Sequence, residues 1–194
     1  MKERNVYILL TDTGTLFTKA IKLYTRKPFN HASIAFDDDL MEVYSFGRKQ
    51  PQNPFVGGFV RENLDDELFS KATCAIYRLT VDAAEYDKMK RYIKQIEGNQ
   101  ENYRYNLLGL FAIPFRIPVT RKNAFFCSQF VASVLIQSGR INFTMPLSLM
   151  TPSMVVQDLE LVFQGNLQDY RTEESLYSYG EHHNNLGRLP LNLY

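Results

Sequence analysis

One cysteine stands where the chain could activate it as a nucleophile. Cys127 comes directly before a series of apolar residues at helical spacing: Phe130, Val131, Val134 and Leu135. We therefore expect Cys127 in the first turn of a largely buried helix, where the helix dipole and unpaired backbone N–H groups favour thiolate. The N–H groups of Cys127 and Ser128 could also stabilise an oxyanion. Taken alone, a cysteine among phenylalanines is more often a small core residue.

His31 is the candidate general base. It begins an expected strand, His31–Phe36, in which the apolar side chains Ala32, Ile34 and Phe36 share one face. His31 and Ser33 lie on the other face, away from the apolar set. A second expected strand, Leu40–Phe46, follows three aspartates, so the two strands predict a hairpin.

The hairpin register selects candidate partners for the imidazole. A two-residue loop at Asp37–Asp38, with both apolar sets on one side, pairs Ile34 with Met41 and Ala32 with Val43. His31 then lies opposite Tyr44, with Glu42 as a diagonal neighbour. A carboxylate stabilises an imidazolium more strongly than a phenol does, so Glu42 is the preferred orienting residue and Tyr44 the alternative. An exposed hairpin histidine with no catalytic role is also compatible with this pattern.

The elements that must position these residues follow from periodicity and turn signals. We expect further strands at Asn5–Leu10 and Thr73–Val81, and helices at Leu16–Tyr24, from Asp82 to Glu97 and from Thr151 to about Phe163. The apolar segment 107–115, broken by Pro114, predicts a short helix followed by a loop. The proline-marked segment 48–54 predicts a loop, and Gly57–Val60 a short irregular crossing. Together with the antiparallel hairpin, we expect these elements to form an α+β fold.

Length and composition exclude several classes of protein. The chain has 194 residues, which suits one domain, and a net charge of +1, which argues against a dedicated nucleic-acid binder. No apolar run is long enough to cross a bilayer, and the N-terminus does not resemble a signal peptide, so we expect a cytoplasmic protein. Cys74 is expected to be buried, His182 and His183 to lie in a solvated tail, and no metal or organic cofactor is implied.

Five segments together resemble a known family. They are Tyr7–Leu10, Phe17–Ile21, Asn30–Ala35, Glu42–Phe46 and Phe126–Val131. In content and order they resemble the permuted papain-like cysteine hydrolases of the NlpC superfamily, specifically the YiiX-like group, and more distantly lecithin retinol acyltransferase. The resemblance covers roughly residues 5–170.

The resemblance implies a circularly permuted papain-like fold, in which a helix that begins at the nucleophilic cysteine packs on an antiparallel sheet. Residues 1–194 would form one such domain, with 167–194 as a C-terminal extension or wrapping tail. The family roles fall on Cys127 as nucleophile, His31 as base and Glu42 as the third residue. The implied activity is hydrolysis of an amide bond in a small peptide, amide or acyl substrate, through a thioester. The alternatives are an acyltransferase or lipid esterase that uses the same pair, and a binding module without turnover.

Overall fold

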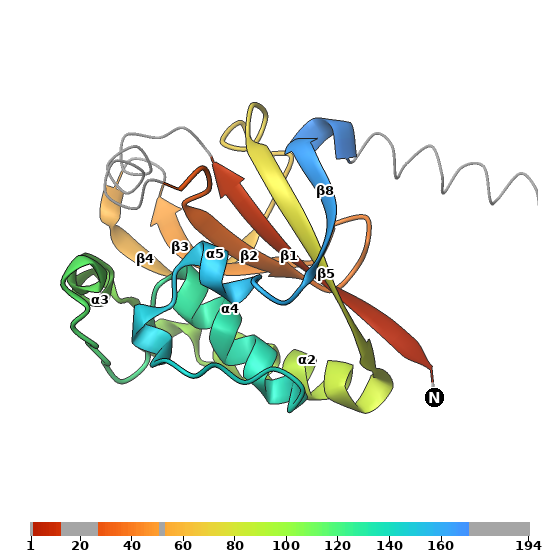
Figure 1. Ribbon diagram of the computed structural model, residues 1–194. Helices are drawn as coiled ribbons and strands as arrows, with labels where there is room; N and C mark the ends of the chain where they lie inside the picture. Colours follow the sequence, from red (N-terminus) through yellow and green to blue (C-terminus); the bar gives the residue numbers. More distant parts are fainter. Residues whose placement is uncertain (1, 13–26, 51–52, 171–194) are drawn as a thin grey trace, which may run out of the picture.

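Six antiparallel strands form the central sheet, in the order β4-β3-β2-β1-β5-β8 (Figure 1). The computed structural model describes residues 2–12, 27–50 and 53–170 of the chain. The strands are β1 (Glu3–Asp12), β2 (His31–Ala35), β3 (Val43–Gln50), β4 (Asn53–Glu62), β5 (Thr73–Asp82) and β8 (Glu160–Asn166). Two short strands, β6 (Arg104–Tyr105) and β7 (Ala124–Phe125), pair in parallel beside them.

Strand β1 lies inside the sheet and is buried on both faces. Its side chains Val6, Ile8 and Leu10 pack with the helices, whereas Tyr7 and Leu9 pack into a second cluster on the opposite face. A strand covered on both sides is apolar at consecutive positions, which explains the unbroken run Val6–Leu10.

Helices cover one face of the sheet (Figure 1). They are α2 (Ala83–Glu97), α3 (Leu107–Ala112), α4 (Cys127–Leu135) and α5 (Pro152–Val155), with single turns at Gln100–Asn102, Ile113–Phe115, Ile136–Ser138 and Leu147–Leu149. Helix α2 buries a stripe formed by Met89, Ile93 and Ile96, as its periodicity predicted, and every residue of α4 is buried. The fold is therefore α+β, with helices packed on an antiparallel sheet. Among the residues that the structure describes, no helix is long and apolar enough to cross a membrane.

The opposite face of the sheet carries the second core cluster. Cys74 and Ile76 of β5 lie in it, and both are fully buried. Leu167 and Tyr170, the first residues of the expected tail, pack into the same cluster. The burial expected of Cys74 is thus confirmed.

The hairpin of β2 and β3 has a different register from the one predicted. Ile34 lies opposite Tyr44 and Ala35 opposite Val43, a shift of three residues that turns the Tyr44 side chain onto the helix-covered face. The cause is a longer loop. The Asp37 carboxylate accepts hydrogen bonds from the backbone N–H groups of Met41 and Glu42, at 2.6 and 2.8 Å.

That loop is closed by a buried leucine in an unusual conformation. Leu40 adopts a φ of 54° and is only 2% exposed, with its side chain in the second core cluster. A positive φ is unfavourable for leucine, so burial of the side chain offsets the backbone strain. Met41, expected in the core, is instead exposed.

Two other predicted elements are wrong. The helix expected from Thr151 to Phe163 is a single turn, α5, after which the chain forms β8 and pairs with β5. Where we expected a loop and a crossing, residues 48–50 belong to β3 and residues 53–60 to β4, and the two strands pair; residues 51 and 52 lie outside the described ranges. The helix expected at Leu16–Tyr24 and the histidines His182 and His183 lie outside the described residues.

Candidate active site

The candidate site lies where β2 and β3 end their pairing and meet the start of α4. The described ladder joins Ile34 to Tyr44 and Ala35 to Val43, and no pair is formed nearer the start of β2. The continued register sets His31 opposite Gly47, where an added Cβ would lie 3.7 Å from His31 Cε1. Cys127, the first residue of α4, reaches the backbone of β2 at this point.

Cys127 is held by contacts on several sides. Its sulfur lies near the His31 side chain and the backbone N–H groups of Ala32 and Ser128, all three of which lower its pKa. The Ser128 hydroxyl donates to the carbonyl of Met150 at 2.7 Å, which fixes the first turn of α4. Cys127 is 4% exposed.

The first turn of α4 keeps backbone donors for an anion. Phe126, at the N-cap, has no side-chain oxygen with which to cap the helix. The first intrahelical hydrogen bond runs from the Phe130 N–H to the Phe126 carbonyl, at 2.9 Å. The N–H groups of Cys127 and Ser128 therefore lie at the positive end of the helix without an intrahelical acceptor.

The cysteine and the histidine shift each other's titration. Burial tends to raise the pKa of Cys127, but the hydrogen bond and charge of His31 and the two backbone N–H groups lower it below its ordinary value. Burial tends to lower the pKa of His31, but the charge of Glu62 and hydrogen bonds with Cys127 and Glu62 raise it to about 10. Both shifts favour a thiolate–imidazolium pair.

Glu62, at the end of β4, is the carboxylate that holds His31. Its Oε1 lies 2.6 Å from His31 Nε2, which leaves Nδ1 as the ring nitrogen for the thiol. The hydroxyl of Ser45 donates to the same oxygen and that of Ser33 to the other, both at 2.6 Å. Burial tends to raise the pKa of Glu62, but His31 and these two hydroxyls lower it, so the carboxylate stays charged although its side chain is only 8% exposed.

The expectation that Glu42 or Tyr44 contacts His31 is wrong. Glu42 accepts a hydrogen bond from the Tyr44 hydroxyl at 2.7 Å and forms an ion pair with Lys90 of α2. The physical reason is the register: the shift of three residues carries Tyr44 to the face that Ile34 occupies, opposite to that of His31. Glu42 and Tyr44 thus tie β3 to α2 and lie apart from the cysteine.

Glu62 is not among the residues predicted from the sequence, because the glycines of Gly57–Val60 predicted an irregular crossing there. The missed signal is alternation: Phe59 lies in the helix-side core, whereas Val60 and Glu62 share the other face with Ser45 and Val43, their neighbours on β3. A strand that ends on a carboxylate beside two serines would have been a candidate for the third residue.

The remaining candidates do not gather at this site. Burial raises the pKa of the Cys74 thiol to about 12, which makes it an unreactive core residue. Within the described ranges, no cluster of three or more His, Cys, Asp or Glu side chains could hold a metal ion.

Comparison with protein-family models, with curated proteins and with solved structures found no match for this chain.

Proposed function

We propose that this chain is a cysteine hydrolase that cleaves an amide bond through a thioester, on a circularly permuted papain-like fold of the NlpC (YiiX-like) type. The observation that carries the proposal is the contact of the Cys127 thiol with an imidazole whose far nitrogen is held by a buried carboxylate. A thiol that only fills the core needs neither partner. Supporting it are the order of the elements and the position of Cys127 at the start of a helix packed on β2 and β3.

Acylation begins from the thiolate–imidazolium pair. The Cys127 sulfur attacks the substrate carbonyl, and the resulting oxyanion accepts hydrogen bonds from the backbone N–H groups of Cys127 and Ser128. The His31 imidazolium then donates its proton to the leaving amine, the C–N bond breaks, and the acyl group remains on sulfur as a thioester.

Deacylation uses the same groups in reverse. Neutral His31 takes a proton from water, the hydroxide attacks the thioester carbonyl, and the carboxylic acid leaves as Cys127 returns to thiolate. Glu62 stabilises His31 whenever the ring is protonated and fixes its orientation throughout. No metal ion takes part in these steps.

A transferase or lipid esterase remains the second candidate, because an alcohol or amine acceptor could replace water in deacylation. The apolar surface over Leu108–Ile117, beside the site, favours an acyl or lipid substrate for such an enzyme. A binding module without turnover is the third candidate, and it differs in predicting a thiol of ordinary pKa.

A panel of acyl-amide and acyl-ester substrates, with and without alcohol and amine acceptors, tests the proposal. We expect turnover by the wild-type chain and a loss of about a thousandfold or more for Cys127→Ala, because the nucleophile is removed. Intact-mass spectra should show the acyl group on the wild-type chain only. Cys74→Ala is the matched control and should keep its activity. Turnover that survives Cys127→Ala would contradict the proposal, and products formed only with an added acceptor would favour the transferase.

A further inference from the structure

An exposed apolar cluster extends from α3 into the segment that follows it. Leu108, Phe111, Phe115 and Ile117 are 62, 60, 74 and 55% exposed. The first three follow at spacings of three and four residues, so they share one side of a helical turn. Exposure of several large apolar side chains in one cluster to water is unfavourable unless another surface covers them.

Basic residues flank this cluster. Arg116 lies within it, Arg121 and Lys122 follow shortly after, and all three are exposed. We call these seven residues, Leu108, Phe111, Phe115, Arg116, Ile117, Arg121 and Lys122, the α3 surface. Among the described residues, the three basic side chains form no ion pair with a carboxylate.

The charge of the surrounding sequence has one sign. No Asp or Glu occurs between Asn102 and Gln157, whereas that stretch contains five Arg or Lys residues. The net charge of +1 for the whole chain therefore conceals a basic central segment and an acidic excess elsewhere. The α3 surface is apolar at its centre and positive at its edge.

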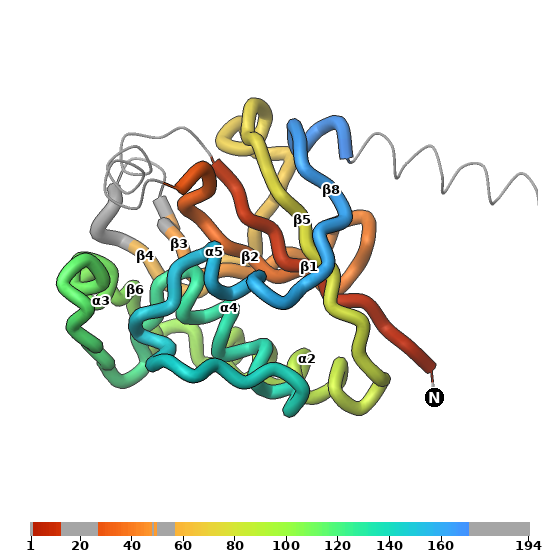
Figure 2. The backbone as a smooth tube through the Cα atoms, viewed as in Figure 1, coloured from red at the N-terminus to blue at the C-terminus, as the bar shows by residue number. Residues whose placement is uncertain are grey.

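The α3 surface adjoins the candidate active site. Helix α3 begins directly after β6, which pairs with β7, and β7 is separated from Cys127 by one residue. The Asn106 side chain, which caps α3, also contacts Gln129 of α4. Figures 1 and 2 show α3 at the edge of the molecule beside β4, at the opposite end from α2.

We propose that the α3 surface docks onto an anionic lipid bilayer. The apolar side chains would enter the boundary between headgroups and acyl chains, and Arg116, Arg121 and Lys122 would lie against the anionic headgroups. A protein partner would have to present an apolar pocket and carboxylates in a matching arrangement. An anionic bilayer presents an apolar layer and anionic headgroups at every point of its surface. Docking would bring substrates held in the membrane to the start of α4.

Flotation with lipid vesicles tests the proposal. We use phosphatidylcholine vesicles with and without about 30% phosphatidylserine, at an ionic strength of about 0.1 M. The wild-type chain should float with the anionic vesicles and at least tenfold less with the neutral ones. Phe111→Ser/Phe115→Ser should lower the partition coefficient at least tenfold. Arg121→Glu/Lys122→Glu should lower it about 25-fold or more, since each basic residue contributes about fivefold.

Matched substitutions elsewhere serve as controls. Met41→Ser removes an equally exposed apolar side chain, and Lys71→Glu/Lys88→Glu reverses two exposed charges outside the α3 surface. Both should float as the wild type does. All substituted positions are exposed, and circular dichroism is to be used to check that each variant is folded.

Three outcomes would overturn docking on lipid. The wild-type chain could fail to float with anionic vesicles, or the α3 variants could float as the controls do. In the third outcome, the wild-type chain does not bind vesicles but forms a dimer, measured by light scattering, that Phe111→Ser/Phe115→Ser dissociates. A second copy of the chain would then cover the α3 surface. Flotation requires no turnover, so this proposal and the proposed hydrolase stand or fail separately.

Discussion

Glu62 is a charge held inside the protein, and three neighbours make that possible. A buried carboxylate is costly unless hydrogen bonds and an opposite charge compensate for the lost water. Ser33 and Ser45 supply two hydroxyl donors at 2.6 Å, and His31 supplies the third contact and the positive charge. Because Ser45 donates to the oxygen that contacts the ring and Ser33 to the other oxygen, the carboxylate is fixed and holds His31 in one orientation.

Replacing Glu62 should impair the site far more than replacing the residue that sequence analysis preferred. Glu62→Gln removes the charge that raises the pKa of His31, so we expect turnover to fall about a hundredfold and the pKa of Cys127 to rise. Glu42→Gln is the matched control, because Glu42 contacts Tyr44 and Lys90 instead. Activity and a thiol titration, followed by the ultraviolet absorbance of the thiolate, check both effects. Equal losses in the two variants would contradict the role given to Glu62.

The ionisation of Cys127 can be measured without a substrate. Its pKa is lowered, so thiolate should persist at pH values where an ordinary thiol, with a pKa near 8.5, is protonated, and should be lost only as the pH falls through the lowered value. We expect the difference in thiolate absorbance between the wild type and Cys127→Ala to show this transition well below pH 8.5. Iodoacetamide at pH 6 should label Cys127 and leave Cys74 unmodified.

The same titration of Cys127 in the His31→Ala variant measures the contribution of the imidazolium. Without the imidazolium the transition of Cys127 should move to higher pH, while the backbone N–H groups of Ala32 and Ser128 keep part of the depression. The activity of the wild type should decline on the alkaline side near pH 10, where His31 loses its proton. A Cys127 that titrates as a free thiol, with or without His31, would favour the binding module.

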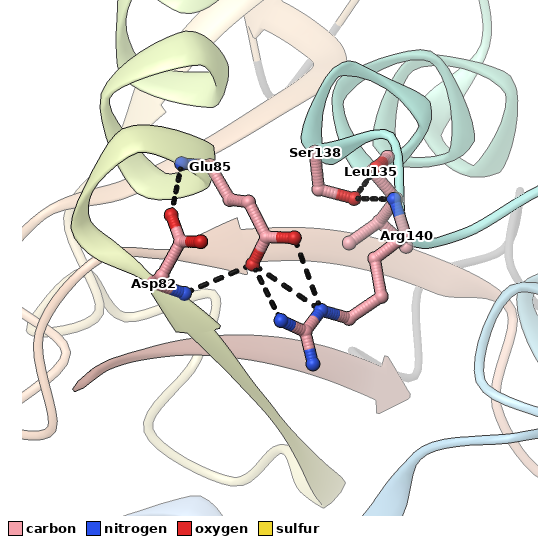
Figure 3. A network of polar contacts seen from close by, with 5 residues as sticks. All are labelled: Asp82, Glu85, Leu135, Ser138 and Arg140. Carbon is pink, nitrogen blue, oxygen red and sulfur yellow. Dashed lines mark hydrogen bonds and ion pairs between the residues drawn. The ribbon is translucent and has the colours of Figure 1, made fainter. Parts of the chain in front are cut away.

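Among the elements, α2 has the best defined start. The Asp82 carboxylate accepts the Glu85 N–H and the Glu85 carboxylate accepts the Asp82 N–H, both at 2.9 Å, which is a capping box (Figure 3). Glu85 also accepts hydrogen bonds from the Arg140 guanidinium, which follows the turn after α4. The Ser138 hydroxyl donates a hydrogen bond to the Leu135 carbonyl and accepts one from the Arg140 backbone N–H. These contacts complete the network and connect α2 with the end of α4.

Loss of the cap should lower stability by a measurable amount. Asp82→Ala removes the side-chain acceptor at the start of α2, at a cost of about 1 kcal/mol, which corresponds to a fall in Tm of roughly 2–4 °C for a chain of this length. Asp87→Ala, at an exposed position inside the same helix, is the control and should leave Tm unchanged. Thermal unfolding followed by circular dichroism measures both. Equal Tm values for the two variants would contradict the capping role.

The strands show how an element depends on its neighbours. His31 begins β2 as predicted, but the register of β2 with β3 differs by three residues from the predicted one. Strands can satisfy their backbone hydrogen bonds in more than one register. Contacts in the loop outside the strands therefore decide which register is adopted. Here the Asp37 carboxylate and the buried Leu40 lengthen the loop.

Across the whole molecule, charge is distributed unevenly although the total is nearly zero. Three of the five basic residues between Asn102 and Gln157 belong to the α3 surface, and the acidic excess lies in the rest of the chain. A net charge of +1 argues against a long-range field, but it does not describe a local surface. The attraction of the α3 surface to anionic lipid therefore depends on where the charges lie.

Local periodicity in the sequence was enough to predict the α+β class, the capped helix α2 and the place of Cys127 at the start of α4. The helices depend on residues three or four positions apart and the strands on alternate residues, whose geometry the backbone fixes. The orienting carboxylate, the hairpin register and strand β8 depended on residues far apart in the chain. Glu62 is 31 residues from His31. Part of the segment predicted to be helical forms β8 instead, because it pairs with the edge of β5. Tertiary packing chooses among such partners because burial and backbone pairing, summed over the sheet, outweigh local preference.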